Sequence, residues 1–232
     1  MNKAASFHPD AGLMRRFLDG VLPMGASIAV SAHVQFCDVC AEAIAKQSEQ
    51  SSSDWYDHIE QEWERDFSDI LESVVEQPSL PLDESAVQID QQTPVQLMDR
   101  RVVLPPVLAK LTSSELAWKQ IASGIHQALV DVDPETKFEF ICMEPAATVP
   151  RHTHLGYEMM LVLQGDITDD LGEYAAMDFV YRDQQDEHGQ ITNEGCVCLF
   201  VTDAPLLFRE GKAKLINPIN RLKHWWGSGK RG

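Results

Sequence analysis

No apolar run in this 232-residue chain approaches the ~20 residues that a membrane-spanning helix needs. The start of the chain, residues 1–7, has no apolar core of the kind that directs secretion. These two features predict a cytoplasmic protein that does not enter a membrane. Bases are also scarce, since 19 Lys and Arg stand against 36 Asp and Glu and give a formal net charge of −17. Such a charge repels phosphate backbones, which excludes direct binding to nucleic acid but not to a basic protein partner.

Cysteines are few and odd in number, with five in the whole chain. An odd number without an export signal disfavours a disulfide framework and favours metal or redox roles. Three of them alternate in apolar segments and are expected to be buried packing residues: Cys142, Cys196 and Cys198. The remaining two, Cys37 and Cys40, form a C-x-x-C pair and are the candidates for chemistry.

The spacing of apolar residues predicts two domains, one helical and one made of strands. Residues 1–76 repeat apolar side chains at helical spacing. Residues 77–112 are polar and proline-containing, and we expect a linker that ends in a short apolar helix opened by Pro105 and Pro106. Residues 113–232 alternate apolar and polar positions in short runs between turn residues, which predicts an antiparallel β-barrel or sandwich.

His33, Cys37 and Cys40 follow the pattern H-x3-C-x2-C, which brings three ligands together on one side of a helix or at a helix end. Zn²⁺ prefers four ligands in a tetrahedron, and two cysteines with two histidines are a standard structural set. His8 is the natural fourth ligand, and zinc bound there staples the start of the chain to the second helix. An ordinary metal-free C-x-x-C is the alternative, and other residues are rival fourth ligands: Asp10, Glu42 and His58.

A second group, H-x-H-x3-E, lies in the β part and consists of His152, His154 and Glu158. Residues i and i+2 of a strand face the same side, so both histidines point inward if either does. His188, further along the chain, supplies a third imidazole. This set suits zinc or another divalent transition metal, and the ligands alone do not choose among Zn²⁺, Fe²⁺, Mn²⁺, Ni²⁺ and Cu²⁺. An exposed pair without metal is the alternative, and two residues rival His188: Asp186 and Glu187.

The spacing of His8, His33, Cys37 and Cys40 resembles that of the ChrR-type zinc-binding anti-sigma factors. The resemblance implies an N-terminal helical zinc-binding anti-sigma domain followed by a cupin-type antiparallel β-barrel, and it covers nearly the whole chain. It also implies that the protein is not an enzyme. Its partner is then an extracytoplasmic-function (group IV) sigma factor, which it inhibits and releases on oxidative stress such as singlet oxygen or organic hydroperoxides.

The second group resembles the first cupin motif, including a glycine seven residues after the glutamate, Gly165. The second cupin motif is degenerate, because its usual Gly-Asp reads Met177-Asp178 here.

Two surfaces suit a sigma factor as partner. The acidic stretch 54–76 complements the basic surfaces with which sigma factors contact polymerase and promoter, and Val102–Leu111 adds an apolar anchor. The alternative function is a metal-dependent cupin enzyme, such as a dioxygenase or isomerase, whose helical module serves oligomerisation.

Overall fold

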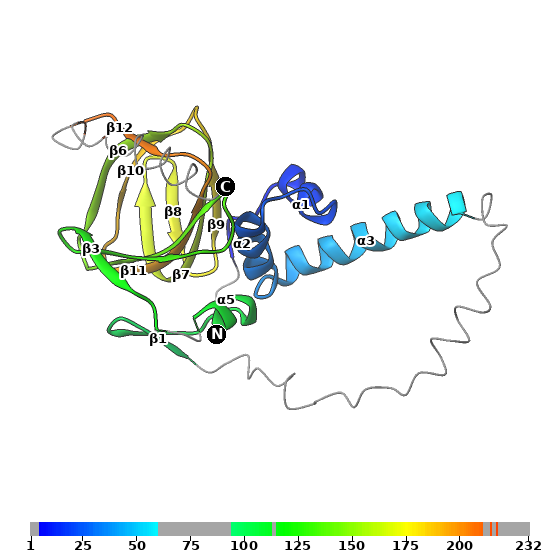
Figure 1. The fold of residues 1–232 in the computed structure, drawn as a ribbon, viewed down its shortest axis with the longest axis horizontal. Helices are drawn as coiled ribbons and strands as arrows, with labels where there is room; N and C mark the ends of the chain where they lie inside the picture. Colours follow the sequence, from blue (N-terminus) through cyan, green and yellow to red (C-terminus); the bar gives the residue numbers. More distant parts are fainter. Residues whose placement is uncertain (1–4, 60–93, 113–114, 211–213, 215–216, 218–232) are drawn as a thin grey trace. The chain divides into compact units, whose positions relative to one another are not determined.

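The structure, a computed structural model, describes residues 5–59, 94–112, 115–210, 214 and 217 (Figure 1). For residues 51–59 it describes the backbone alone. The chain forms two compact units, one of residues 1–41 with 91–232 and the other of residues 42–90. The domain boundaries predicted after residues 76 and 112 fall on stretches outside the described residues, so that division stays a prediction.

The N-terminal part is helical, as predicted, with α1 (Ala11–Leu18), α2 (Met24–Val34) and α3 (Asp38–Ile59). Asp10 caps α1 by accepting a hydrogen bond from the Leu13 N–H at 2.8 Å. The first turn of α2 is held from the β part, where the Asp133 carboxylate accepts from the Gly25 N–H at 2.6 Å. Among the described residues no single helix is long and apolar enough to span a membrane; α2 and the start of α3 pass that test only as a pair bent by 115°.

The β part is antiparallel. Its strands are β1 (Val95–Leu97), β2 (Arg100–Val102), β3 (Trp118–Ala122), β4 (Ile125–Val130), β5 (Lys137–Met143), β6 (Thr148–His154), β7 (Glu158–Asp169), β8 (Gly172–Ala175), β9 (Phe179–Arg182), β10 (Glu187–Ile191), β11 (Cys196–Thr202) and β12 (Leu206–Phe208). β1 and β2 form a hairpin, and the other strands run in the order β12-β6-β10-β7-β11-β5-β4-β3, with β8 and β9 also paired to β7. The sheet curls on itself (Figure 1), and buried apolar side chains fill its interior, which confirms the cupin-type fold.

Strand β7 is the centre of the curl because it changes partners along its length. Its first half pairs with β9 and β11, and its second half pairs with β8 and β10. At the change of partners Gly165 has φ +84°, and a Cβ there would lie 2.0 Å from the Gly195 carbonyl oxygen. Only glycine fits at this position.

The turn between β8 and β9 has an unusual backbone. Met177 adopts φ +76°, a left-handed conformation that usually belongs to glycine. This is the position where the cupin Gly-Asp pair is degenerate, so the turn is kept although its glycine is replaced. The Met177 N–H donates to the Val162 carbonyl at 2.7 Å, which holds the turn against the sheet.

Helix α5 (Pro106–Leu111) forms where the two prolines predicted it and contacts α2. Leu108 is fully buried, and Val102 and Leu104 are almost so. Val102–Leu111 was expected to offer an apolar anchor to a partner. That prediction is wrong for these three side chains, because they pack inside the protein.

Candidate metal centres

The first group of candidate ligands lies at the corner between α2 and α3. His33 is in the last turn of α2, Cys37 lies between the helices, and Cys40 is in the first turn of α3. The sequence pattern therefore acts at a helix end and not along one helix face. His8 joins them from the segment before α1, and the four ligand atoms all lie within 4.8 Å of one another.

The spacings inside this group match a small tetrahedron. The His8 Nδ1 atom is 3.3 Å from the His33 Nε2 atom. The same His8 atom is 3.4 Å from the Cys37 sulfur and 3.5 Å from the Cys40 sulfur. A tetrahedral zinc ion with bonds of about 2.1 Å to nitrogen and 2.3 Å to sulfur has edges of about 3.4 and 3.6 Å between these atom types. The three edges that meet at His8 Nδ1 thus fit such an ion, and the remaining pairs of ligand atoms lie within 4.8 Å.

The protonation states of this group also suit a cation. His33 Nδ1 donates to the Met177 carbonyl at 2.9 Å, which leaves the lone pair of Nε2 facing the group. Burial lowers the pKa of His33 to about 4, so its imidazole is neutral at pH 7. Burial and the adjacent Cys37 raise the pKa of Cys40 to about 12. A divalent cation offsets the cost of forming thiolates here, so its binding releases protons.

The second group lies inside the curled sheet. Strand pairing sets His188 of β10 directly opposite His152 of β6, and His154 is two residues further on the same side of β6. The Nε2 atoms of His154 and His188 are 3.2 Å apart. Glu158, the first residue of β7, has its two carboxylate oxygens 3.9 Å from His188 Nε2 and 4.0 Å from His154 Nδ1. His188 therefore joins the group, as predicted, despite the degenerate motif.

All four side chains of the second group are buried, with exposed fractions of 1–3%. Three of their polar atoms have no hydrogen-bond partner among the described residues: His152 Nε2, His154 Nδ1 and Glu158 Oε1. Buried polar atoms without partners are costly, and a bound cation is the partner that would satisfy His152 Nε2 and Glu158 Oε1. The donor set and these atoms therefore fit a divalent metal.

Burial also decides the charges of the second group. It lowers the pKa of His152 to about 4 and that of His154 to about 3, so both rings are neutral at pH 7. It raises the pKa of Glu158 to about 7. Neutral imidazoles have a free lone pair for a cation, and a bound cation would stabilise the ionised form of the Glu158 carboxylate.

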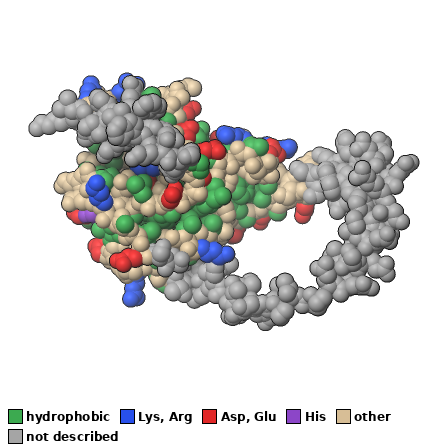
Figure 2. All heavy atoms as spheres, viewed as in Figure 1, with side chains coloured by type: hydrophobic (Ala, Val, Ile, Leu, Met, Phe, Trp, Pro, Cys, Tyr) green, Lys and Arg blue, Asp and Glu red, His purple; other side chains and the backbone are tan. Residues whose placement is uncertain are grey.

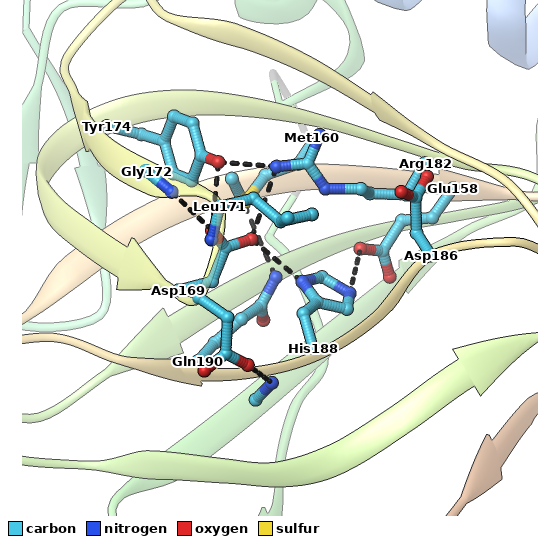
Figure 3. Close-up of polar contacts among 12 residues, drawn as sticks. Glu158, Met160, Asp169, Leu171, Gly172, Tyr174, Arg182, Asp186, His188 and Gln190 are labelled. Carbon is cyan, nitrogen blue, oxygen red and sulfur yellow. Dashed lines mark hydrogen bonds and ion pairs between the residues drawn. The ribbon is translucent and has the colours of Figure 1, made fainter.

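Asp169 orients the ring of His188 (Figure 3), and the sequence reasoning missed it. The carboxylate accepts from His188 Nδ1 at 2.9 Å, which leaves Nε2 free to face the other ligands. It also accepts from the Tyr174 hydroxyl at 2.9 Å and from Arg182 at 3.3 Å. Burial alone would raise the pKa of Asp169, but these hydrogen bonds outweigh it and hold the pKa below its ordinary value. No pattern of spacing in the sequence marks this residue.

The rival ligands lie elsewhere or are not described. Asp10 caps α1, Glu42 is exposed, and the side chain of His58 is outside the described residues. Glu187 forms ion pairs with Arg151 and Arg209 at the surface. The Asp186 carboxylate accepts from the Asp183 N–H at 3.0 Å within a turn.

Comparison with known proteins identifies the family. A family profile described as the ChrR Cupin-like domain matches residues 109–206. The anti-sigma-E factor ChrR of Cereibacter sphaeroides is 31% identical over 222 residues, which cover 93% of this chain and 98% of that protein. The chain belongs to the ChrR family of anti-sigma factors.

One solved structure agrees with the ChrR fold, and another resembles the chain over less than half its length. The crystal structure of Rhodobacter sphaeroides SigE in complex with the anti-sigma ChrR matches with a TM-score of 0.62 and 22% identity, over 86% of this chain and 100% of that chain. An RmlC-like cupin from Shewanella frigidimarina matches with a TM-score of 0.37 and 16% identity, over 40% of this chain and 86% of that chain. The first match shows that the helical part and the cupin part occur together in a known fold.

Proposed function

We propose that this protein binds an extracytoplasmic-function sigma factor, keeps it from RNA polymerase and releases it on oxidative stress. The observation that carries the proposal is the relationship to the anti-sigma-E factor ChrR over 98% of that protein. The ChrR structure that matches this chain is a complex with SigE, which supports a sigma factor as the partner here. The net charge of −17 adds a reason for rapid association with a basic partner.

Exposed apolar side chains of the helical part suit such a partner. Val21, Met24 and Val39 have exposed fractions of 62%, 59% and 65%. Hydrophobic side chains lie among charged ones on the face shown in Figure 2. Apolar side chains of this kind supply the affinity of an interface once a partner covers them. We assign the sigma-binding surface to these exposed apolar side chains, of which Val21 precedes α2, Met24 begins α2 and Val39 lies in the first turn of α3.

We further propose zinc in the first group, held by His8, His33, Cys37 and Cys40. Two sulfur and two nitrogen donors at tetrahedral spacing favour Zn²⁺ over harder cations. Bound there, zinc supplies a cross-link between the start of the chain and the α2–α3 corner. The residues thereby fix the two helices that present the binding surface.

The second group, His152, His154, Glu158 and His188, we assign to zinc or another divalent transition metal. Its four donors are all buried, whereas catalytic zinc sites usually have three protein donors and an open position. If the ion is zinc, these four donors complete its tetrahedron and support a sensing or structural role, whereas a metal that prefers six ligands would keep two open positions and permit the enzyme alternative. Oxidation of these ligands would change the conformation of the cupin domain and so lower the affinity of the helices for the sigma factor.

Transcription in vitro tests the proposal. RNA polymerase, the sigma factor and its promoter are combined with increasing amounts of this protein. We expect transcription to stop near an equimolar amount of the protein and to resume when hydroperoxide or singlet oxygen is supplied. Full transcription in the presence of excess protein would show that it is no inhibitor, and inhibition that persists under oxidant would remove the proposed signal.

A further inference from the structure

The turn between β8 and β9 contacts the ligands of the first group. The Met177 carbonyl accepts from His33 Nδ1 at 2.9 Å and so fixes the orientation of that ring. The Phe179 ring lies edge-on to the His33 ring, with centroids 5.8 Å apart. A turn of the cupin sheet therefore holds a ligand that belongs to a helix.

The same turn also holds the segment that carries His8. The Asp178 carboxylate accepts from the Ser6 and Phe7 N–H groups at 2.6 and 3.0 Å. The Phe179 N–H donates to the Phe7 carbonyl at 3.0 Å. His8 is the next residue, so the position of its backbone depends on this turn.

The other end of the turn reaches the second group. The Tyr174 hydroxyl donates to Asp169 at 2.9 Å, and Asp169 accepts from His188 Nδ1 at 2.9 Å (Figure 3). The Tyr174 ring is 2% exposed and meets the Phe7 ring edge-on with centroids 4.8 Å apart. One buried side chain thus contacts both the residue that orients His188 and the residue before His8.

The connection between the two ends is stiff. The Ala175 N–H donates to Asp178 at 2.8 Å, which closes the turn on itself. The Met177 N–H donates a hydrogen bond to the Val162 carbonyl of β7, and Tyr174 belongs to the apolar core. Close-packed elements of this kind transmit a displacement because they have no space in which to absorb it.

We infer that the segment 174–179 couples the two candidate metal sites and that the Tyr174 hydroxyl is the positioning group that links them. A change in ligand geometry at His188 moves Asp169 and Tyr174, and the Tyr174 ring then displaces the segment that carries His8. Because coupling between sites is reciprocal, the state of the first group also affects the second. The inference deepens the proposed function, since it gives the cupin site a physical route to the sigma-binding helices.

Cobalt binding in the absence of any sigma factor tests this coupling. Only the first group contains cysteine, so the charge-transfer absorption of Co²⁺ bound to thiolate reports that group alone. The dissociation constant for Co²⁺ is measured with and without the substitution Glu158→Gln, which disturbs the second group with little change in shape. We expect Glu158→Gln to weaken cobalt binding at the first group by at least about fivefold in the parent protein.

The same measurement is repeated in two further backgrounds. Tyr174→Phe removes the hydroxyl but keeps the ring, and the effect of Glu158→Gln should fall below about twofold there. Tyr181→Phe is the matched control, because the Tyr181 ring on β9 stacks on Tyr157 instead, and the fivefold effect should remain.

Equal effects of Glu158→Gln in all three backgrounds, or no effect in the parent, would overturn the coupling. Circular dichroism checks the fold of each variant, and His152→Ala replaces Glu158→Gln if the latter does not fold. A failure of the proposed function would leave these results unchanged, because no sigma factor takes part in the measurement.

Discussion

Replacing Asp178 with asparagine should weaken the attachment of the start of the chain to the cupin sheet, because the Ser6 and Phe7 N–H groups share one oxygen, Oδ1, which then carries no charge. Asp178 is 2% exposed and accepts from three backbone N–H groups, those of Ser6, Phe7 and Ala175. Asparagine offers one acceptor oxygen in place of two and turns an NH₂ group towards at least one of these donors. The other hydrogen bonds lose the carboxylate charge, which roughly halves their strength. One unsatisfied buried donor and two weakened bonds together cost about 2–5 kcal/mol.

Hydrogen exchange and urea unfolding measure this effect. In Asp178→Asn the amides of Ser6 and Phe7 should lose protection, and the free energy of unfolding should fall by the amount above. Asp183→Asn is the control, since that carboxylate accepts from Gln185 in an exposed turn and its loss should cost less than about 1 kcal/mol. Unchanged protection of the two amides in Asp178→Asn would refute the docking of this segment.

Other perturbations test the site and the packing. Chelator-treated protein should have a lower free energy of unfolding at pH 5 than at pH 7. Histidines of the unfolded chain bind protons with a pKa of about 6.5, whereas burial in the folded protein lowers the pKa of three ligand histidines to about 4 or below: His33, His152 and His154. Glu158 acts in the opposite direction, because burial raises its pKa to about 7 and its contribution to the free energy of unfolding is lost as the pH rises towards 7. A free energy of unfolding in urea that is no lower at pH 5 than at pH 7 would contradict the burial of the three histidines. Leu108→Ala should lower the free energy of unfolding by about 2–5 kcal/mol, because it leaves a cavity under α5. Val103 is partly exposed, so Val103→Ala is the control in thermal denaturation, and an equally small loss of stability in both variants would contradict this packing. Met177→Gly should change the same free energy by less than about 1 kcal/mol, because glycine relieves the left-handed backbone; a loss above 2 kcal/mol on urea unfolding would speak against strain at this turn.

Both groups of candidate ligands could be predicted because their spacing is local. Cys37 and Cys40 stand three apart at the start of a helix, and His152 and His154 share one side of a strand, so short-range geometry brings each pair together. His8 and His188 were predicted from the chemistry of incomplete ligand sets. The structure brings both of them to the predicted groups.

The contacts around the ligands could not be predicted, because they join residues far apart in the sequence. Asp178 holds the N–H of Ser6 across 172 positions, and His33 donates to Met177 across 144. Such contacts depend on how the turn between β8 and β9 meets the helices, which no periodicity encodes. The Met177-Asp178 pair was the only feature of the sequence that marked this turn. It was interpreted as a degenerate cupin motif, whereas in the structure the turn holds His33 and the segment before His8.

The most direct test of the central claim is metal analysis of the complex formed with the sigma factor. The parent protein should copurify with the sigma factor and carry about two metal ions per chain. Cys37→Ser should lose one ion and the complex together, whereas Cys142→Ser, a buried cysteine of β5 outside both groups, should keep both. A Cys37→Ser protein that has lost its ion and still binds the sigma factor as tightly as the parent would contradict the account.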